Sequence, residues 1–250
     1  MLEEGDETPL AMAAFKGNIK VMKLLLDANA DINARDKQLG PLLNQAILSG
    51  NLEAVKLLVD KDANISDEEF SPLRFAAALP DRTVYNYLME AGRNHLQDHD
   101  YDSALITAAY AGNTEIFKEL LEYEHDKDTY QKALDEATGE AEWPIVRLTM
   151  EKCEGLDCNN LFKVVATVKE DLDSLLEAVW DYADGSISQE ALNDALYEAT
   201  DREKNSTVKT LLDLKADPNS TGAEYVNIML HLVGCANNQQ IRECIDRSGV

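Results

Sequence analysis

The chain has 250 residues, 45% of them hydrophobic, and its 47 acidic and 23 basic side chains give a formal net charge of −24. This hydrophobic content predicts a folded protein rather than a disordered one. The charge argues against direct binding to a nucleic-acid backbone, because that affinity depends on clustered lysine and arginine.

Several classes of protein are disfavoured by short-range features of the sequence. No apolar run approaches the ~18 residues that a membrane span needs, and residues 1–20 lack the basic start and apolar core of a signal peptide. The four cysteines are too few and too clustered to form a disulfide framework for the chain: Cys153, Cys158, Cys235 and Cys244. We therefore predict reduced thiols, a cytoplasmic or nuclear location and no membrane partner.

The first predicted unit, residues 8–33, consists of a helix, a turn, a second helix and a loop. Pro9 suits the first turn of a helix, because its φ is fixed and its missing N–H is not needed there. Gly17 suits the left-handed end of that helix. An apolar second helix over residues 21–26 follows at once.

The same unit recurs three more times before residue 125, with first helices that begin near Pro41, Ser71 and Ser103. A small residue of the first helix returns at intervals of 33, 30 and 32 residues: Ala13, Ala46, Ala76 and Ala108. A nearly constant period of this size is typical of a solenoid built from stacked helical hairpins.

Residues 1–125 resemble the ankyrin repeat family, whose unit is about 33 residues long with a Thr-Pro-Leu-His-x-Ala core. The best copy is Thr8-Pro9-Leu10 with Ala13-Ala14, and the next is Ser71-Pro72-Leu73 with Ala76-Ala77. All four copies lack the family's histidine, which is replaced by Ala11, Asn44, Arg74 and Ile106. The hydrogen bond that this histidine usually makes between neighbouring turns must therefore be replaced or lost.

The repeat frame weakens but persists over residues 126–250. It predicts four divergent units, marked by Leu134 with Ala137, residues 161–176, Leu196 with Ala199, and Met229 with Leu232. Residues 241–247 are predicted to form a C-terminal cap. The predicted fold is an all-α ankyrin-repeat solenoid of about eight helix-turn-helix units, forming a single array over residues 1–250.

The family resemblance implies that partners meet a concave groove lined by the short first helices. The positions around the paired alanines are expected to face it: Met12, Phe15, Gln45, Leu48, Phe75, Thr107, Tyr110, Glu136 and Glu140. The groove would be apolar and aromatic in repeats 1–4 and acidic beyond. Loop tips at residues 36–38, 67–70 and 98–102 would add charge. The alternative is that Phe15, Phe75 and Tyr110 pack between repeats.

No motif in the sequence predicts catalysis or a cofactor. A glycine-rich phosphate loop and a Gly-x-Ser-x-Gly motif are both missing. His95 and His99 have a spacing that can hold zinc on a helix, but the repeat frame places them in the loop between repeats 3 and 4. Cys153 and Cys158 lack a second pair at zinc spacing. We predict no catalytic residue, no metal and no cofactor.

The leading functional prediction is a monomeric, non-enzymatic protein–protein interaction module. It would bind a basic or mixed basic–apolar segment in the groove, with acidic charge steering the encounter. Residues 101–200 alone hold 23 acidic and 7 basic side chains, a net charge of −16. Two alternatives stay open: an enzyme or small-ligand protein with a pocket in divergent repeats 5–8, and an acidic mimic of nucleic acid. Aromatic residues beside carboxylates also suit a methylated lysine.

Overall fold

The computed structural model describes residues 8–168 and 173–220. The chain forms two compact units, Met1–Leu156 and Asp157–Val250. The described ranges contain fourteen helices in seven consecutive hairpins and one short strand pair, which confirms the predicted all-α solenoid fold. The eighth predicted repeat and the cap at residues 241–247 lie outside the described residues. The single array over residues 1–250 remains a prediction.

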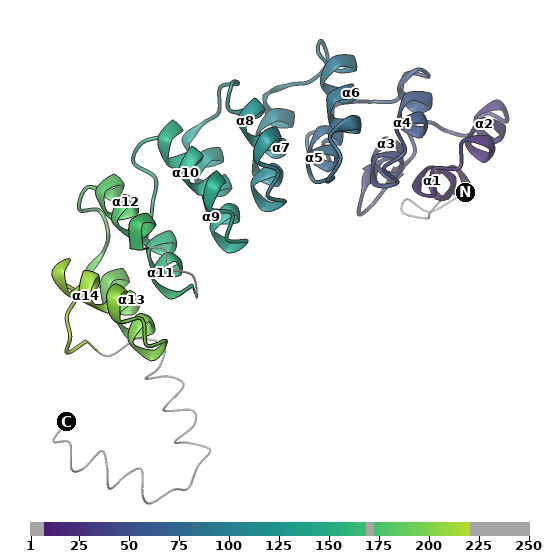
Figure 1. Cartoon of the computed structure of the whole chain (residues 1–250). Helices are drawn as coiled ribbons and strands as arrows, with labels where there is room; N and C mark the ends of the chain where they lie inside the picture. The colour runs from purple at the N-terminus through teal and green to yellow at the C-terminus, as the bar shows by residue number, and fades with distance from the viewer. Residues whose placement is uncertain (1–7, 169–172, 221–250) are drawn as a thin grey trace, which may run out of the picture. The chain divides into compact units, whose positions relative to one another are not determined.

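The first unit holds five helical hairpins side by side in chain order (Figure 1). The first helices of these hairpins are α1 (Pro9–Phe15), α3 (Leu42–Leu48), α5 (Pro72–Ala77), α7 (Asp98–Tyr110) and α9 (Lys127–Gly139). The second helices are α2 (Ile19–Asp27), α4 (Leu52–Val59), α6 (Thr83–Ala91), α8 (Thr114–Leu120) and α10 (Trp143–Lys152). Strands β1 (Arg35–Asp36) and β2 (Gly40–Pro41) pair antiparallel in the loop between α2 and α3.

The second unit holds two further hairpins within its described residues. Their helices are α11 (Asn159–Thr167), α12 (Asp173–Ala183), α13 (Gln189–Asp201) and α14 (Asn205–Asp213). The first helices contact each other, α11 against α13, and the second helices do the same, α12 against α14. The divergent half therefore keeps the hairpin order that the weak sequence frame predicts.

Local sequence explains how each hairpin starts and stops, and the first one is representative. The hydroxyl of Thr8 accepts a hydrogen bond from the backbone N–H of Ala11 at 3.1 Å and caps α1, with Pro9 in the first turn. Gly17 has a φ of +60°, a conformation that favours glycine, and reverses the chain after α1. The side chain of Asn18 then caps α2 by accepting from the N–H of Val21.

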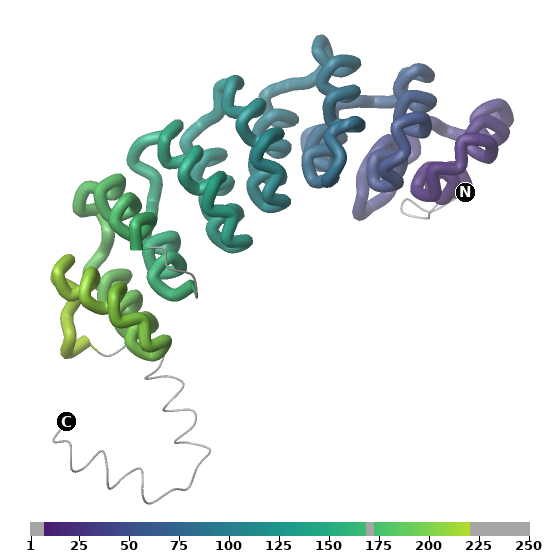
Figure 2. Tube along the Cα trace, viewed as in Figure 1, coloured from purple at the N-terminus to yellow at the C-terminus, as the bar shows by residue number. Residues whose placement is uncertain are grey.

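Small residues let neighbouring first helices of the first unit pack closely in one row, beside the row of second helices (Figure 2). The alanines at this contact are fully buried: Ala14, Ala46, Ala76, Ala108 and Ala137. The second helices contribute a layer of large side chains that are equally inaccessible: Met22, Val55, Tyr85, Phe117 and Val146. Burial of this apolar surface stabilises the stack by about 25 cal/mol per Å² removed from water.

Asn44 replaces the missing family histidine at the junction of repeats 2 and 3. Its side chain is fully buried, and its Nδ2 donates to the backbone carbonyls of Leu39 at 2.6 Å and Phe70 at 2.8 Å. One amide group therefore connects the turn of its own repeat to the turn of the next. The expected hydrogen bond between turns is replaced here by a different side chain.

Asp100 corrects the prediction that residues 98–102 form a loop tip. These residues are the first turns of α7, and the carboxylate of Asp100 is fully buried. It accepts hydrogen bonds from the hydroxyls of Ser66 at 2.6 Å and Ser71 at 2.5 Å, and from the N–H of Gln97 at 3.1 Å. An acidic residue in a first helical turn also meets the positive end of the helix dipole. The helix therefore starts earlier than the run of polar residues indicates.

Two further contacts between repeats use asparagine side chains that reach back to the previous repeat. Asn51 Nδ2 donates to the carbonyl of Gly17 at 3.2 Å. Asn113 Nδ2 donates to the carbonyls of Ala77 at 2.5 Å and Leu79 at 3.1 Å. These bonds satisfy carbonyl groups at the ends of α1 and α5, which have no partner within their own helices.

The Asn44→Ala substitution is expected to lower the free energy of unfolding by about 2 kcal/mol, because it leaves two partly buried carbonyls without their donor. Urea unfolding followed by circular dichroism measures the effect. The control is Asn86→Ala on the exposed side of α6, which should change stability by less than about 0.5 kcal/mol. Equal effects of the two substitutions would show that Asn44 is not a structural bridge.

Asp67 links repeats 2 and 3 through an ion pair with Arg35. Burial raises the pKa of Asp67, but the hydrogen bond from Arg35 and those from the N–H groups of Phe70 and Glu69 outweigh it and hold that pKa below its ordinary value. A carboxylate with a lowered pKa stabilises the fold above the unfolded-state pKa, and this stabilisation is lost as the pH falls through the folded-state pKa.

The stability difference between wild type and Asp67→Asn should therefore be constant from about pH 7 to pH 5 and shrink below about pH 4. Urea unfolding at a series of pH values measures it. Glu68→Gln, at an exposed neighbouring position, controls for the removal of one negative charge. A difference that does not change with pH would contradict the role of the Asp67 carboxylate.

Candidate binding groove

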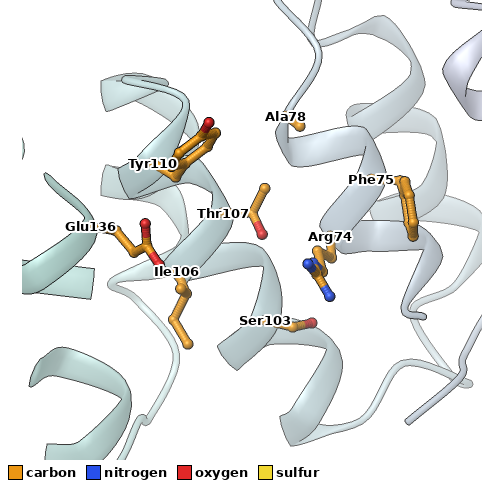
Figure 3. Close-up of a pocket in the computed structure, with 8 residues that line it drawn as sticks. All are labelled: Arg74, Phe75, Ala78, Ser103, Ile106, Thr107, Tyr110 and Glu136. Carbon is orange, nitrogen blue, oxygen red and sulfur yellow. The ribbon is translucent and has the colours of Figure 1, made fainter. Parts of the chain in front are cut away.

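A hollow of 570 Å³ lies in the first unit across the first helices of repeats 3, 4 and 5 (Figure 3). Helix α5 and the residue that follows it form one wall of the hollow, and α7 forms a second wall. Helix α9 contributes a single side chain. The lining residues are Arg74, Phe75, Ala78, Ser103, Ile106, Thr107, Tyr110 and Glu136. Four of these, namely Phe75, Thr107, Tyr110 and Glu136, are among the nine residues that the sequence predicts for a binding site.

The α7 wall is one face of a helix. Ser103, Ile106, Thr107 and Tyr110 are spaced three or four residues apart, so their side chains leave the helix on the same side. The opposite face of α7 carries buried Ala104 and the paired alanines of the repeat contact. The packing that holds α7 in the stack therefore also fixes the direction of the groove-lining side chains.

The aromatic residues of the groove differ in their accessibility. The side chain of Tyr110 is 55% exposed at the end of α7, and Phe75 on α5 is half-buried. Both line the hollow, together with the apolar side chains of Ile106 and Ala78. An exposed tyrosine beside half-buried apolar side chains is the combination that protein interfaces favour, because the ring offers contact area and the hydroxyl stays near water.

Two charged groups lie at different sides of the groove. The guanidinium of Arg74 is exposed and lies 6.0 Å from the centre of the Phe75 ring, within range of a cation–π contact. Glu136 enters from α9, and Figure 3 shows it beside Ile106 on the side away from Arg74. The hollow thus has an apolar lining between one cation and one carboxylate. Glu140 is exposed one turn beyond Glu136 and adds carboxylate outside the hollow.

The other predicted groove residues lie elsewhere on the first unit. Met12 and Phe15 are 38% and 48% exposed on α1, whereas Leu48 is half-buried at the end of α3. Gln45 is only 5% exposed and lies against the hairpin of β1 and β2, where it borders a very small hollow. Gln45 therefore presents almost no surface to a partner.

Sequence reasoning missed Arg74, Ala78, Ser103 and Ile106 as lining residues. A signal for two of them was present, because Arg74 and Ile106 occupy the position of the missing family histidine. A side chain freed from bridging two turns can face the groove instead. Asn44 shows the other outcome, since it remains buried at that position.

The candidate metal residues are placed separately from this groove. His99 lies in the first turn of α7 with its Nε2 3.5 Å from Asp100 Oδ2, and His95 is exposed in the preceding loop. Within residues 8–168 and 173–220, His, Cys, Asp and Glu side chains form no group of three or more that could hold a metal ion. Cys235 and Cys244 lie outside the described residues.

The divergent second unit has a hollow of its own, of 500 Å³, between α13, α14 and the loop that follows. Its lining includes Leu196, Tyr197 and Leu212 together with Asp201 and Asp217. It reaches Ser220, the last described residue, so the predicted small-ligand pocket in repeats 5–8 remains a prediction. Among the helices described, none is long and apolar enough to cross a membrane.

Comparisons with known proteins agree with this architecture. Residues 10–95 match a family model described as ankyrin repeats in three copies. The described fold is similar to the crystal structure of the human ASB11 ankyrin repeat domain, with a TM-score of 0.59 and 21% sequence identity over 84% of this chain and 99% of that one. A search of curated protein sequences finds no match. The predicted resemblance to the ankyrin repeat family is thereby confirmed for residues 10–95.

Proposed function

We propose, from the membership of residues 10–95 in the ankyrin repeat family, that this chain captures a protein segment in the groove of α5, α7 and α9. Ankyrin repeats are generally protein–protein interaction modules and are typically not enzymes. The observation that supports the location is the coincidence of the 570 Å³ hollow with four independently predicted residues. A fold alone does not specify a partner, so the chemistry of the groove must do so.

The lining favours a segment that is both basic and apolar. Phe75, Ile106 and Tyr110 offer apolar contact, while Glu136 and the nearby Glu140 offer carboxylates to a lysine or arginine. Arg74 adds one donor for an acidic or carbonyl group of the same segment. The bound segment would thus carry its basic residue toward α9 and an acceptor toward α5.

The charge distribution supports fast capture of such a segment. The excess of acid is greatest over residues 101–200, which include α9 and most of α7. A negative field of this kind raises the rate of encounter with a basic partner more than it raises the affinity itself. In this proposal the chain binds the segment as a monomer, in the cytoplasm or the nucleus.

The double substitution Phe75→Ala/Tyr110→Ala should weaken partner binding at least about tenfold, because aromatic side chains carry much of the binding energy at interfaces. The chain serves as bait, captured proteins are identified, and the dissociation constant of a purified partner is measured. Tyr123→Ala is the matched control, since Tyr123 is 37% exposed but does not line the groove. If every captured protein binds both variants equally, the groove is not the binding site.

Raising ionic strength should slow association with that partner by about tenfold or more and change dissociation far less. Stopped-flow or surface-based kinetics at ~0.05 and ~0.5 M salt measure both rates, since screening is nearly complete at the higher value. Glu136→Gln/Glu140→Gln should reduce this salt dependence. An association rate that is independent of salt would contradict charge steering.

A further inference from the structure

The two charged side chains that line the groove, Arg74 and Glu136, form no ion pair within residues 8–168 and 173–220. Arg35 and Arg82, in contrast, are each paired with a carboxylate of the next repeat. Both charges of the groove are therefore available to a bound segment. Covering either of them without an opposite charge would cost binding free energy.

The hydroxyl of Thr107 is a third unused group in the groove. Figure 3 shows Thr107 on α7 between Arg74 and Glu136. Thr138 and Thr149 donate their hydroxyls to the carbonyl four residues earlier in their own helices. Within the described part of the chain the Thr107 hydroxyl makes no such bond, although its side chain is half-buried. A segment that covers Thr107 must therefore offer it a polar group.

The two charges lie on different sides of α7. Helix α7 contacts α5, which carries Arg74, and α9, which carries Glu136; the three helices follow one another in a row (Figure 2). An α-helix with its side chains is about 10–12 Å wide, so a bound segment must cross about this distance to reach both charges. An extended chain covers about 13 Å in four residues, whereas a helix covers only about 6 Å.

We infer that the groove recognises an extended segment with an acidic and a basic side chain four residues apart and an apolar side chain halfway between them. The inference rests on the function proposed above and specifies the partner of that same site. Side chains i, i+2 and i+4 of an extended segment leave it on one face. The acid would pair with Arg74, the apolar side chain would cover Ile106, and the base would pair with Glu136.

The unused hydroxyl of Thr107 favours an extended segment over a helical one. The backbone N–H and C=O groups of an extended segment are free to bond to this hydroxyl, whereas a helix uses most of its own internally. A wholly basic segment fits less well, although the acidic chain would attract it, because it would place like charge against Arg74. Arg74 therefore determines which basic segments fit and in which register.

The test uses a displayed library of segments of about nine residues, in which each position is Asp, Lys, Leu or Ser, so that the spacing can occur in several registers. Selection on the wild-type chain, with depletion on Phe75→Ala/Tyr110→Ala, retains the segments that depend on the groove. These should carry Asp and Lys four residues apart with Leu halfway, in either chain direction. The best segment should bind Thr107→Val about threefold more weakly.

Proline separates the extended segment from a helix, in which Asp and Lys at this spacing would also lie on one face. A proline at the solvent-facing position i+3 breaks a helix but suits an extended chain. The dissociation constant of the best segment should therefore change less than about threefold when this proline is introduced.

Charge reversal in the groove tests the two pairings separately. Selection on Arg74→Glu should replace the Asp of the retained segments by Lys, and selection on Glu136→Lys should replace their Lys by Asp. Each variant should bind the best wild-type segment at least about fivefold more weakly. Arg93→Glu and Glu90→Lys are the matched controls, because both positions are exposed and neither lines the groove. They should change its affinity less than about twofold, and circular dichroism confirms that every variant is folded.

The outcomes distinguish this inference from the proposed function. Retained segments that lack an acid, or that keep the same charges on Arg74→Glu, would overturn the inference and leave the groove in place as a binding site. Loss of binding on introduction of the proline would overturn it in favour of a helix. If no segment survives the depletion on Phe75→Ala/Tyr110→Ala, the groove itself is contradicted and the inference fails with it.

Discussion

Close contact between successive first helices is the constraint on which the rest of the first unit depends. Fully buried alanines such as Ala46, Ala76 and Ala108 leave no room for larger side chains at this contact. Once that face of each helix is committed to packing, the opposite face must line the groove. Ala108 follows Thr107 and Ala109 precedes Tyr110 in the sequence. Because these alanines face the contact between repeats, the side chains of Thr107 and Tyr110 face the groove.

Polar groups then determine how neighbouring repeats are joined. A stack of helices leaves carbonyls at helix ends and turns without partners, and burying them unsatisfied would cost stability. Asn44, Asn51 and Asn113 supply donors to these carbonyls, while the buried carboxylate of Asp100 accepts from two serine hydroxyls. Asn44 takes the position of the family histidine and bonds two turns, whereas Asn51, Asn113 and Asp100 join repeats from other positions.

The sequence alone predicted the period and the helical hairpins, because these depend on apolar spacing and on alanine. Four of the eight side chains that line the hollow of α5, α7 and α9 are also among the nine predicted positions, whose role in binding stays a prediction. Sequence reasoning failed where a single long-range contact decides the outcome. Residues 98–102 look like a polar loop, but they are the first turns of α7, where the buried Asp100 accepts hydrogen bonds from Ser66 and Ser71. Gln45 has the spacing of a groove residue, yet it is buried beside a very small hollow that residues of β1, β2 and α1 also line. Local periodicity contains no information about such neighbours.

The junctions have a consequence for how this chain could have been assembled. Asn44 is matched to Phe70 of the following repeat, and Asp100 is matched to Ser66 and Ser71 of the preceding one. Repeat 3 therefore carries acceptors for one neighbour and donors for the other. Removing it, or exchanging it with repeat 4, would bring together side chains whose hydrogen-bonding groups do not correspond. The repeats share one architecture, but their order is not free: modular shuffling that a consensus array tolerates would leave buried polar groups unpaired here.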